Sequence, residues 1–109
     1  MIFVAIPEHG PALASEADAL ELVGQLFGQE VETLAIPVAR MAPEFWDLRS
    51  RLAGLFIQKL TNYGIRPAFV GDLRAQIAAS AALAAYVREC QRGNDVIFVD
   101  HLADLERRT

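Results

Sequence analysis

The sequence predicts a single α/β domain, residues 1–109, in which helices pack on a central, mostly parallel sheet of four or five strands. Short runs rich in Val, Ile and Phe alternate along the chain with longer segments of helical periodicity, which is the order typical of parallel sheets. Most positions of each run are apolar, as expected of strands buried on both faces. The length suits one domain, and we find no repeat and no linker.

Four apolar runs are the expected strands: residues 2–6, 31–36, 67–70 and 96–99. Gly, Pro or Asp residues lie next to each run, as they do at the ends of strands. We expect Pro67 to lie at a strand start or a sheet edge, because its nitrogen cannot donate a hydrogen bond to a neighbouring strand. A short fifth strand over residues 12–14 would pair back on the first.

Four helices are expected between and after these strands. Ser15 should cap the first helix, with Asp18 in its acidic first turn and Gly28 at its end. The second helix should begin at Pro43, because proline suits the first helical position, and end at residues 62–64. One continuous helix is expected over residues 74–92 and a short one over 101–107. The predicted order is strand, optional strand, helix, strand, helix, strand, helix, strand, helix.

An unusual motif runs through the middle of the chain. Residues 43–48 read PEFWDL, residues 58–63 read QKLTNY and residues 68–72 read AFVGD. With DALEL at residues 18–22 and ECQRG at 89–93, these segments resemble the bacterial family called domain of unknown function 4180 over about residues 15–100. In that family serine and threonine residues follow the VGD segment, whereas residues 73–80 contain one hydroxyl, Ser80. The resemblance implies a fold but no activity.

The order of strands and helices also resembles the STAS-like fold of anti-sigma-factor antagonists and sulfate-transporter tails. In the antagonists, a serine in the turn after the third strand is phosphorylated as a switch. The corresponding turn here, residues 37–43, contains neither serine nor threonine. We therefore expect this chain to work without the phosphoserine switch.

Composition argues against several classes of protein. Ten basic and fourteen acidic residues give a net charge of −4, which is unfavourable for nucleic-acid binding. No apolar run is long enough to span a membrane, and residues 1–6 lack the basic region of a signal peptide. The single cysteine, Cys90, can form neither an internal disulfide nor a cysteine metal cluster, so a cytoplasmic location is expected. No glycine-rich phosphate motif is found, and we expect no cofactor.

The loops after the strands are the candidate ligand site, because open α/β sheets usually bind ligands at the carboxyl ends of their strands. We expect Arg40, Asp72, Arg74 and His101 to bind a ligand there. No catalytic constellation is visible, and the only other histidine, His9, gives no metal-ligand spacing with His101. We therefore assign no catalytic residue and no metal site.

Phe45 and Trp46 are the most distinctive pair of residues. Neighbours on a helix point about 100° apart, so a buried Phe45 would leave Trp46 exposed as an anchor for a partner. The alternative is a core that wraps around both. The leading hypothesis is a non-enzymatic, cytoplasmic interaction or regulatory module that forms a homodimer or binds an unidentified protein. The competing hypothesis is a small-ligand-binding protein or minor enzyme that uses the strand-end loops.

Overall fold

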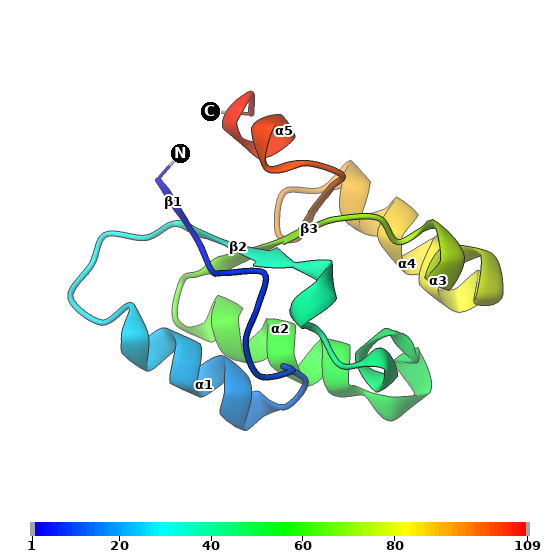
Figure 1. Cartoon of the computed structure of the whole chain (residues 1–109), viewed down its shortest axis with the longest axis horizontal. Coiled ribbons are helices and arrows are strands. Elements are labelled where there is room, and N and C mark those ends of the chain that lie inside the picture. The colour runs from blue at the N-terminus through cyan, green and yellow to red at the C-terminus, as the bar shows by residue number, and fades with distance from the viewer. Residues whose placement is uncertain (1, 109) are drawn as a thin grey trace.

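The computed structural model describes residues 2–108, in which four parallel strands form one sheet (Figure 1). The strands lie side by side in chain order, and each corresponds to one of the expected apolar runs. In the register of the sheet, Ala35 on the second strand lies opposite Ala68 on the third, which lies opposite Ile97 on the fourth. The strands are β1 (Phe3–Ala5), β2 (Thr33–Pro37), β3 (Arg66–Val70) and β4 (Ile97–Val99).

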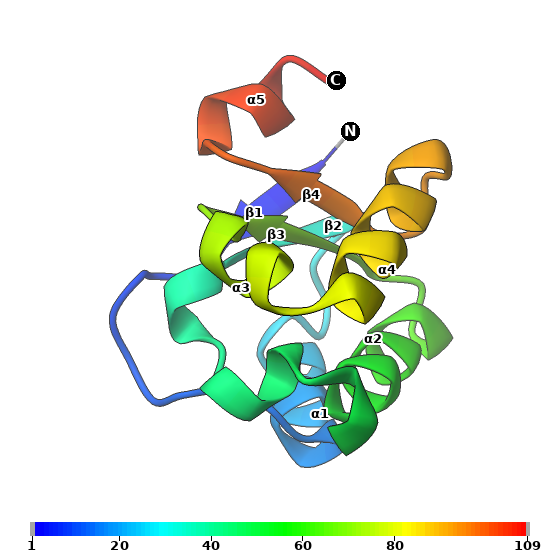
Figure 2. The same ribbon diagram turned by 90° about the vertical axis from the view of Figure 1, so that its right-hand side faces the viewer.

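Helices cover the two faces of this sheet unequally. Figure 2 shows the short last helix on one side of the sheet and the first two helices together on the other. Within residues 2–108, no helix has the combination of length and apolarity that a membrane span needs. The helices are α1 (Glu16–Gln25), α2 (Leu52–Asn62), α3 (Arg74–Ala79), α4 (Ala81–Arg92) and α5 (Leu102–Glu106).

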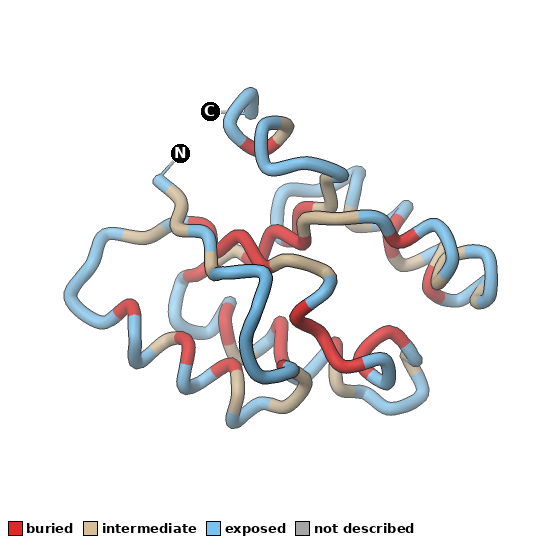
Figure 3. The backbone as a smooth tube through the Cα atoms, viewed as in Figure 1, coloured by how far each residue is buried: buried red, intermediate tan, exposed pale blue. Residues whose placement is uncertain are grey.

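The hydrophobic core lies mainly between the sheet and helices α1, α2 and α4. Figure 3 shows buried positions along β2 and β3 and on the inner sides of α1 and α2. Phe45, Phe56 and Phe69 are its largest fully buried side chains. The opposite face carries small residues, Ala35 and Ala68, and is covered by Leu105 of α5. The bulk of the core is therefore on the face that α1 and α2 cover.

The start of α1 forms as the sequence predicts. Ser15 Oγ accepts a hydrogen bond from the Asp18 amide at 3.2 Å, and Asp18 Oδ2 accepts from the Ser15 amide at 3.0 Å. This reciprocal pair satisfies two amides that the helix itself leaves without partners. Hydrogen bonds from the backbone amides of Ser15 and Ala14 also lower the pKa of Asp18. The capping prediction is confirmed.

Pro67 is the second residue of β3, an inner strand, and it disrupts no pairing. The Arg66 amide donates to Glu32 O on the β2 side at 2.8 Å. Amides alternate in direction along a strand, so the Pro67 nitrogen faces β4. Pairing with β4 begins only at Ala68. The proline therefore lies near the strand start, where no hydrogen bond is lost.

The expected fifth strand over residues 12–14 is wrong. Leu13 forms a single parallel bridge with Met41, beyond the end of β2, and does not pair with β1. The Leu13 amide donates to Arg40 O at 2.7 Å, and the Ala42 amide donates to Leu13 O at 2.9 Å. The chain after β1 crosses to the end of β2 because this backbone bridge and the Arg40 side chain hold it there.

The expectation that α2 begins at Pro43 is also wrong. Residues 43–46 and 48–50 form two short 3₁₀ turns, and α2 begins only at Leu52. Arg51 has a left-handed backbone with φ of 65°, which interrupts the helix. Ser50 Oγ donates to Glu44 O and accepts from the Leu52 amide, so local side-chain bonds replace the helical pattern.

The predicted helix over residues 74–92 is two helices, so the structure has five α-helices within residues 2–108 where four were expected. Ser80 breaks the segment, with φ of −143° and ψ of 109°, and its Oγ accepts from the Leu83 amide at 3.1 Å. In the second of the two helices Leu83 is buried and Ala81 is exposed. Ser80 acts here as the cap of α4.

Candidate functional site

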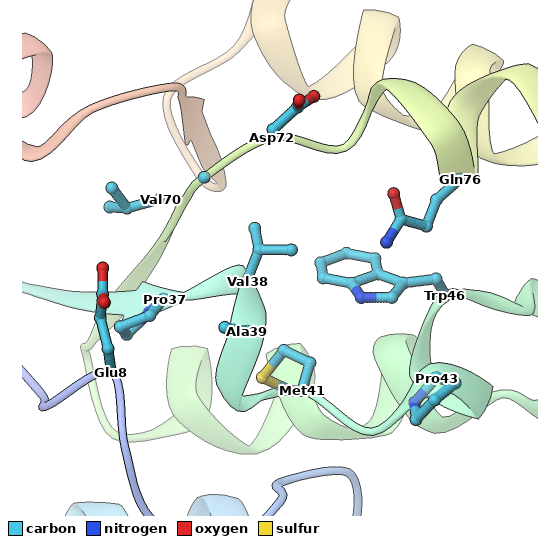
Figure 4. Close-up of a pocket in the computed structure, with 11 residues that line it drawn as sticks. Glu8, Pro37, Val38, Ala39, Met41, Pro43, Trp46, Val70, Asp72 and Gln76 are labelled. Atoms are coloured by element: carbon cyan, nitrogen blue, oxygen red, sulfur yellow. The ribbon is translucent and has the colours of Figure 1, made fainter.

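A pocket opens at the carboxyl end of the sheet, meaning the end at which the parallel strands finish (Figure 4). Its volume is about 460 Å³, and its wall comes from the loop after β1, the segment after β2 and the loop after β3. This is the end where open α/β sheets bind ligands. The lining residues are Glu8, Pro37, Val38, Ala39, Met41, Pro43, Trp46, Val70, Gly71, Asp72 and Gln76.

Trp46 forms one side of this pocket while most of its ring belongs to the core. Phe45 is fully buried and only 6% of Trp46 is exposed. The two rings meet edge to face with centroids 4.9 Å apart, and Phe69 contacts both. Residues 43–46 form a 3₁₀ turn before α2, and the core cluster includes both rings. This arrangement matches the alternative of a core around both side chains, and a partner contact through them stays a prediction.

A second hollow of about 420 Å³ adjoins the pocket. Trp46 and Gln76 line both spaces, and residues 47–49, 79, 80 and 82 supply other parts of the second wall. In Figure 4 the Gln76 side chain extends from α3 toward the Trp46 indole. The chain's single tryptophan therefore lies between two neighbouring hollows, and its fluorescence should respond to occupation of either.

Val38 and Gly71 bring the segments after β2 and β3 close together. Gly71 has φ of 141°, a backbone conformation that favours glycine. A Cβ atom at this position would lie 3.0 Å from Val38 Cβ, closer than ordinary packing allows. Glycine therefore permits the close approach that forms this side of the pocket.

The tripeptide Asp-Leu-Arg lies beside these hollows twice, at residues 47–49 and 72–74, and it folds in the same way both times. Asp72 Oδ1 accepts from the Arg74 amide at 2.9 Å and from its Nε at 3.0 Å, while Oδ2 accepts from Nη2 at 2.9 Å. These hydrogen bonds lower the pKa of Asp72 to about 2. Asp47 makes the corresponding bonds with Arg49 at 3.1, 3.1 and 3.2 Å. Each exposed carboxylate is thus neutralised by its own arginine.

Arg40, a predicted ligand-binding residue, is buried and holds the loop after β1. Its Nη1 donates to Pro7 O at 2.9 Å and its Nε donates to Pro11 O at 3.1 Å. Gly10 packs against the guanidinium so closely that a Cβ there would lie 2.8 Å from Arg40 Cζ. The hydrogen bonds of this arginine go to main-chain carbonyls, so Arg40 positions the loop that brings Glu8 to the pocket.

The four predicted ligand-binding residues do not form one site. Asp72 and Arg74 are bound to each other, but Arg40 lies under the loop after β1. His101 precedes α5, where its amide donates to Asp104 Oδ2 at 3.1 Å. Arg74 and Asp104 line a separate hollow of about 290 Å³ near the end of β4. Among residues 2–108, no three His, Cys, Asp or Glu side chains form a group suited to a metal ion.

Three residues that line the pocket were not among those predicted from the sequence to bind a ligand: Glu8, Val38 and Gln76. Glu8 lies in the turn after an apolar run, which is the same signal that led to Asp72, and could have been found. Val38 and Gln76 have no such signal, because an aliphatic side chain and a helical amide are common everywhere. Their role depends on how the segments after β2 and β3 fold back on each other.

Comparison with known proteins gives a family and no described activity. No curated protein and no solved structure matches the chain. A family match covers residues 2–109, which is nearly the whole sequence and includes every segment of the pocket. The chain therefore belongs to the family described as Domain of unknown function (DUF4180).

Proposed function

We propose that this protein binds a small organic molecule in the pocket at the carboxyl end of the sheet. The single observation that carries the proposal is the pocket itself, with its volume of about 460 Å³ between the loops after β1, β2 and β3. Ligand sites in proteins typically have volumes of about 300–1,000 Å³. The proposal concerns binding and assigns no reaction to the site.

The chemistry of the wall supports this proposal. Val38, Met41 and Trp46 offer apolar surface, while Glu8 and Gln76 offer polar groups at separate points. Binding pockets commonly combine an apolar lining with a few polar groups that fix the orientation of the ligand. The wall is also well anchored, because Trp46 packs on Phe45 and Phe69 in the core.

The structure weakens one reason for proposing an interaction module. That hypothesis took Trp46 as an exposed anchor for a partner, but only 6% of Trp46 is exposed. The Trp46 ring packs on Phe45 and Phe69 in the protein's own core, so ligand binding becomes the better supported of the two hypotheses.

A protein interaction remains the second candidate because of apolar side chains elsewhere. Phe27, at the end of α1, is 89% exposed, and Leu20, Leu55 and Tyr63 on or next to α1 and α2 are also exposed. Such side chains can form an interface between copies or with another protein. Native mass spectrometry of the wild type and of Phe27→Ser tests it: a dimer lost in the variant would support this candidate, and a monomer in both would contradict it.

We also propose a STAS-like fold and a cytoplasmic location for this protein. The alternation of strands and helices supports a relation to the STAS-like fold, in a version without the phosphoserine switch. A single cysteine suits a reducing compartment and supports a cytoplasmic location.

A variant that fills the pocket tests the proposed function. Ala39 is exposed and lines the pocket, so Ala39→Phe should block it without disturbing the core. Ala85→Phe makes the same change at an exposed position on α4 and is the matched control. In a ligand-observed NMR screen of mixed small molecules, we expect hits that bind the wild type and Ala85→Phe but not Ala39→Phe. Hits that bind all three proteins equally, or no hits, would contradict the proposal.

A further inference from the structure

The charges around the pocket are unevenly distributed and indicate which ligands it accepts. Its eleven lining residues include two carboxylates, Glu8 and Asp72, and no lysine, arginine or histidine. A phosphate or carboxylate ligand would meet like charges in this wall and no cation to hold it. The lining therefore disfavours anions.

The two carboxylates differ in what they can offer a ligand. Both oxygens of Asp72 accept hydrogen bonds from Arg74, whose guanidinium neutralises the charge. Glu8 is exposed and takes part in no hydrogen bond or ion pair within residues 2–108. The pocket therefore contains one carboxylate, that of Glu8, whose charge no protein cation offsets.

Glu8 is held in place through the loop that carries it. The carbonyl of the preceding residue, Pro7, accepts from Arg40 Nη1 at 2.9 Å, and Pro11 O accepts from Nε at 3.1 Å. These bonds fix the backbone on both sides of Glu8 to the segment after β2. The carboxylate thus belongs to an anchored loop, which lowers the entropic cost of using it to bind a ligand.

The groups across the pocket from Glu8 are apolar or neutral. Figure 4 shows Glu8 on one side of Val38, with the Trp46 indole and the Gln76 amide on the other. A ligand lying over Val38 would place one end at the carboxylate and the other against the indole. The wall therefore matches a molecule that has a positive charge at one end and an apolar or aromatic group at the other.

We propose that the pocket selects a small organic cation, a protonated amine joined to an apolar or aromatic body, and that Glu8 pairs with the ammonium group. This inference rests on the proposed function and adds the chemical class of the ligand. A hydrogen bond between an ammonium and a carboxylate is charge-assisted and roughly twice as strong as one between neutral groups.

Three probes with the same phenylethyl skeleton test the charge preference: phenethylamine, hydrocinnamate and phenethyl alcohol. Binding is followed by the fluorescence of Trp46, the only tryptophan in the chain. We expect the amine to change this fluorescence saturably and to bind at least about tenfold more tightly than the other two. Equal or tighter binding of the anion or the alcohol would contradict the proposal that the ligand is a cation, while still supporting the proposal that the pocket binds a ligand. Saturation by none of the three would count against both proposals.

Variants of Glu8 test whether this side chain is responsible. Glu8→Gln should remove the preference for the amine, and Glu8→Lys should favour hydrocinnamate instead. Glu30→Gln removes an exposed carboxylate outside the pocket and is the matched control, so it should leave the preference intact. Both positions are exposed, so the variants should fold, which far-ultraviolet circular dichroism verifies. An unchanged amine preference in Glu8→Gln would contradict the role of Glu8.

Discussion

The carboxyl and amino ends of the sheet each have an arginine that donates to a main-chain carbonyl of a distant segment, yet only one end forms an apolar pocket. At the carboxyl end, Arg40 binds Pro7 O and Pro11 O. At the amino end, Arg66 donates from Nη1 to Asn94 O at 3.1 Å and from Nε to Thr33 Oγ1 at 3.2 Å. The local chemistry of the two arginines is similar, so the difference must come from the segments that they hold.

Volume alone does not distinguish the two ends. The hollow at the amino end measures about 410 Å³ against about 460 Å³ at the carboxyl end. Its wall is polar, with Glu32, Thr61, Arg66 and Asn94 among its residues, and no aromatic side chain lines it. The long segment after β2 carries Trp46 to the carboxyl end, whereas the residues between α2 and β3 form only a short turn. The composition of the wall is therefore a better guide to a binding site than its size.

The largest expected effect comes from removing the two arginines in turn. Arg40→Ala should lower the free energy of unfolding by about 3 kcal/mol, because it removes two hydrogen bonds from a charged donor, each worth about 1.5 kcal/mol. Arg66→Ala should cost only about 1 kcal/mol, because its side chain is partly exposed and solvent can replace it. Urea denaturation measures both. Equal losses of stability in the two variants would show that Arg40 holds the loop after β1 no more firmly than Arg66 holds the segment at the amino end of the sheet.

A pair of glycine substitutions sharpens the same comparison. Gly10→Ala should destabilise the protein by about 2 kcal/mol, since the new methyl would meet the Arg40 guanidinium and φ is 153°. Gly24→Ala, at a helical position with open space around it, should stabilise by up to about 1 kcal/mol. Thermal unfolding should therefore shift in opposite directions. A neutral Gly10→Ala would mean that the loop does not pack against Arg40.

A smaller effect concerns Ser80, whose cap starts α4 behind the pocket. Ser80→Ala should lower stability by about 1 kcal/mol, because the Leu83 amide loses its acceptor. Ser80→Asp should retain most of the stability, since aspartate also caps helices well. Chemical denaturation of the three proteins checks this. If Ser80→Ala were as stable as the wild type, capping would not explain the break between α3 and α4.

The smallest effect is a shift in the titration of Asp72. Its pKa in the folded protein lies at about 2, below the usual 3.8, because Arg74 donates to the carboxylate. A lowered pKa stabilises the folded state above the pKa of the unfolded chain, and this contribution is lost as pH falls toward 2. Carbon-detected NMR should give a midpoint near 2 in the wild type and a higher one in Arg74→Gln, where only the hydrogen bond from the residue-74 amide remains. A normal midpoint in the wild type would show that the pair is open in solution.

The sequence predicted the parts of the fold that depend on periodic patterns. Apolar runs gave all four strands, and Ser15 with Asp18 gave the start of α1, because these signals are local. The prediction of a helix from Pro43 was wrong for residues 43–51. There Asp47 and Ser50 form hydrogen bonds with nearby backbone groups, and Arg51 adopts a left-handed conformation. These competing bonds depend on the path of the chain, which periodicity does not encode.

The sequence predicted where the candidate site lies better than it predicted which residues line it. The pocket lies at the strand ends, where a ligand site was predicted, and Asp72 is among its lining residues, so ligand binding by Asp72 stays a prediction. Arg40 was expected to face a ligand but binds the loop after β1, because the crossing of that loop over the end of β2 is a tertiary feature. The same crossing brings Glu8 to the pocket. The positions of Arg40 and Glu8 therefore both depend on one contact between distant segments.

Mapping the amide chemical shifts of the wild-type protein during titration with phenethylamine tests the central claim most directly. We predict saturable shifts at the carboxyl end, at Glu8, Val38, Gly71 and Gln76, and none at Gly64, Arg66 and Asn94 at the amino end. Shifts of similar size at both ends, or none at the carboxyl end, would contradict the assignment of the pocket as the binding site.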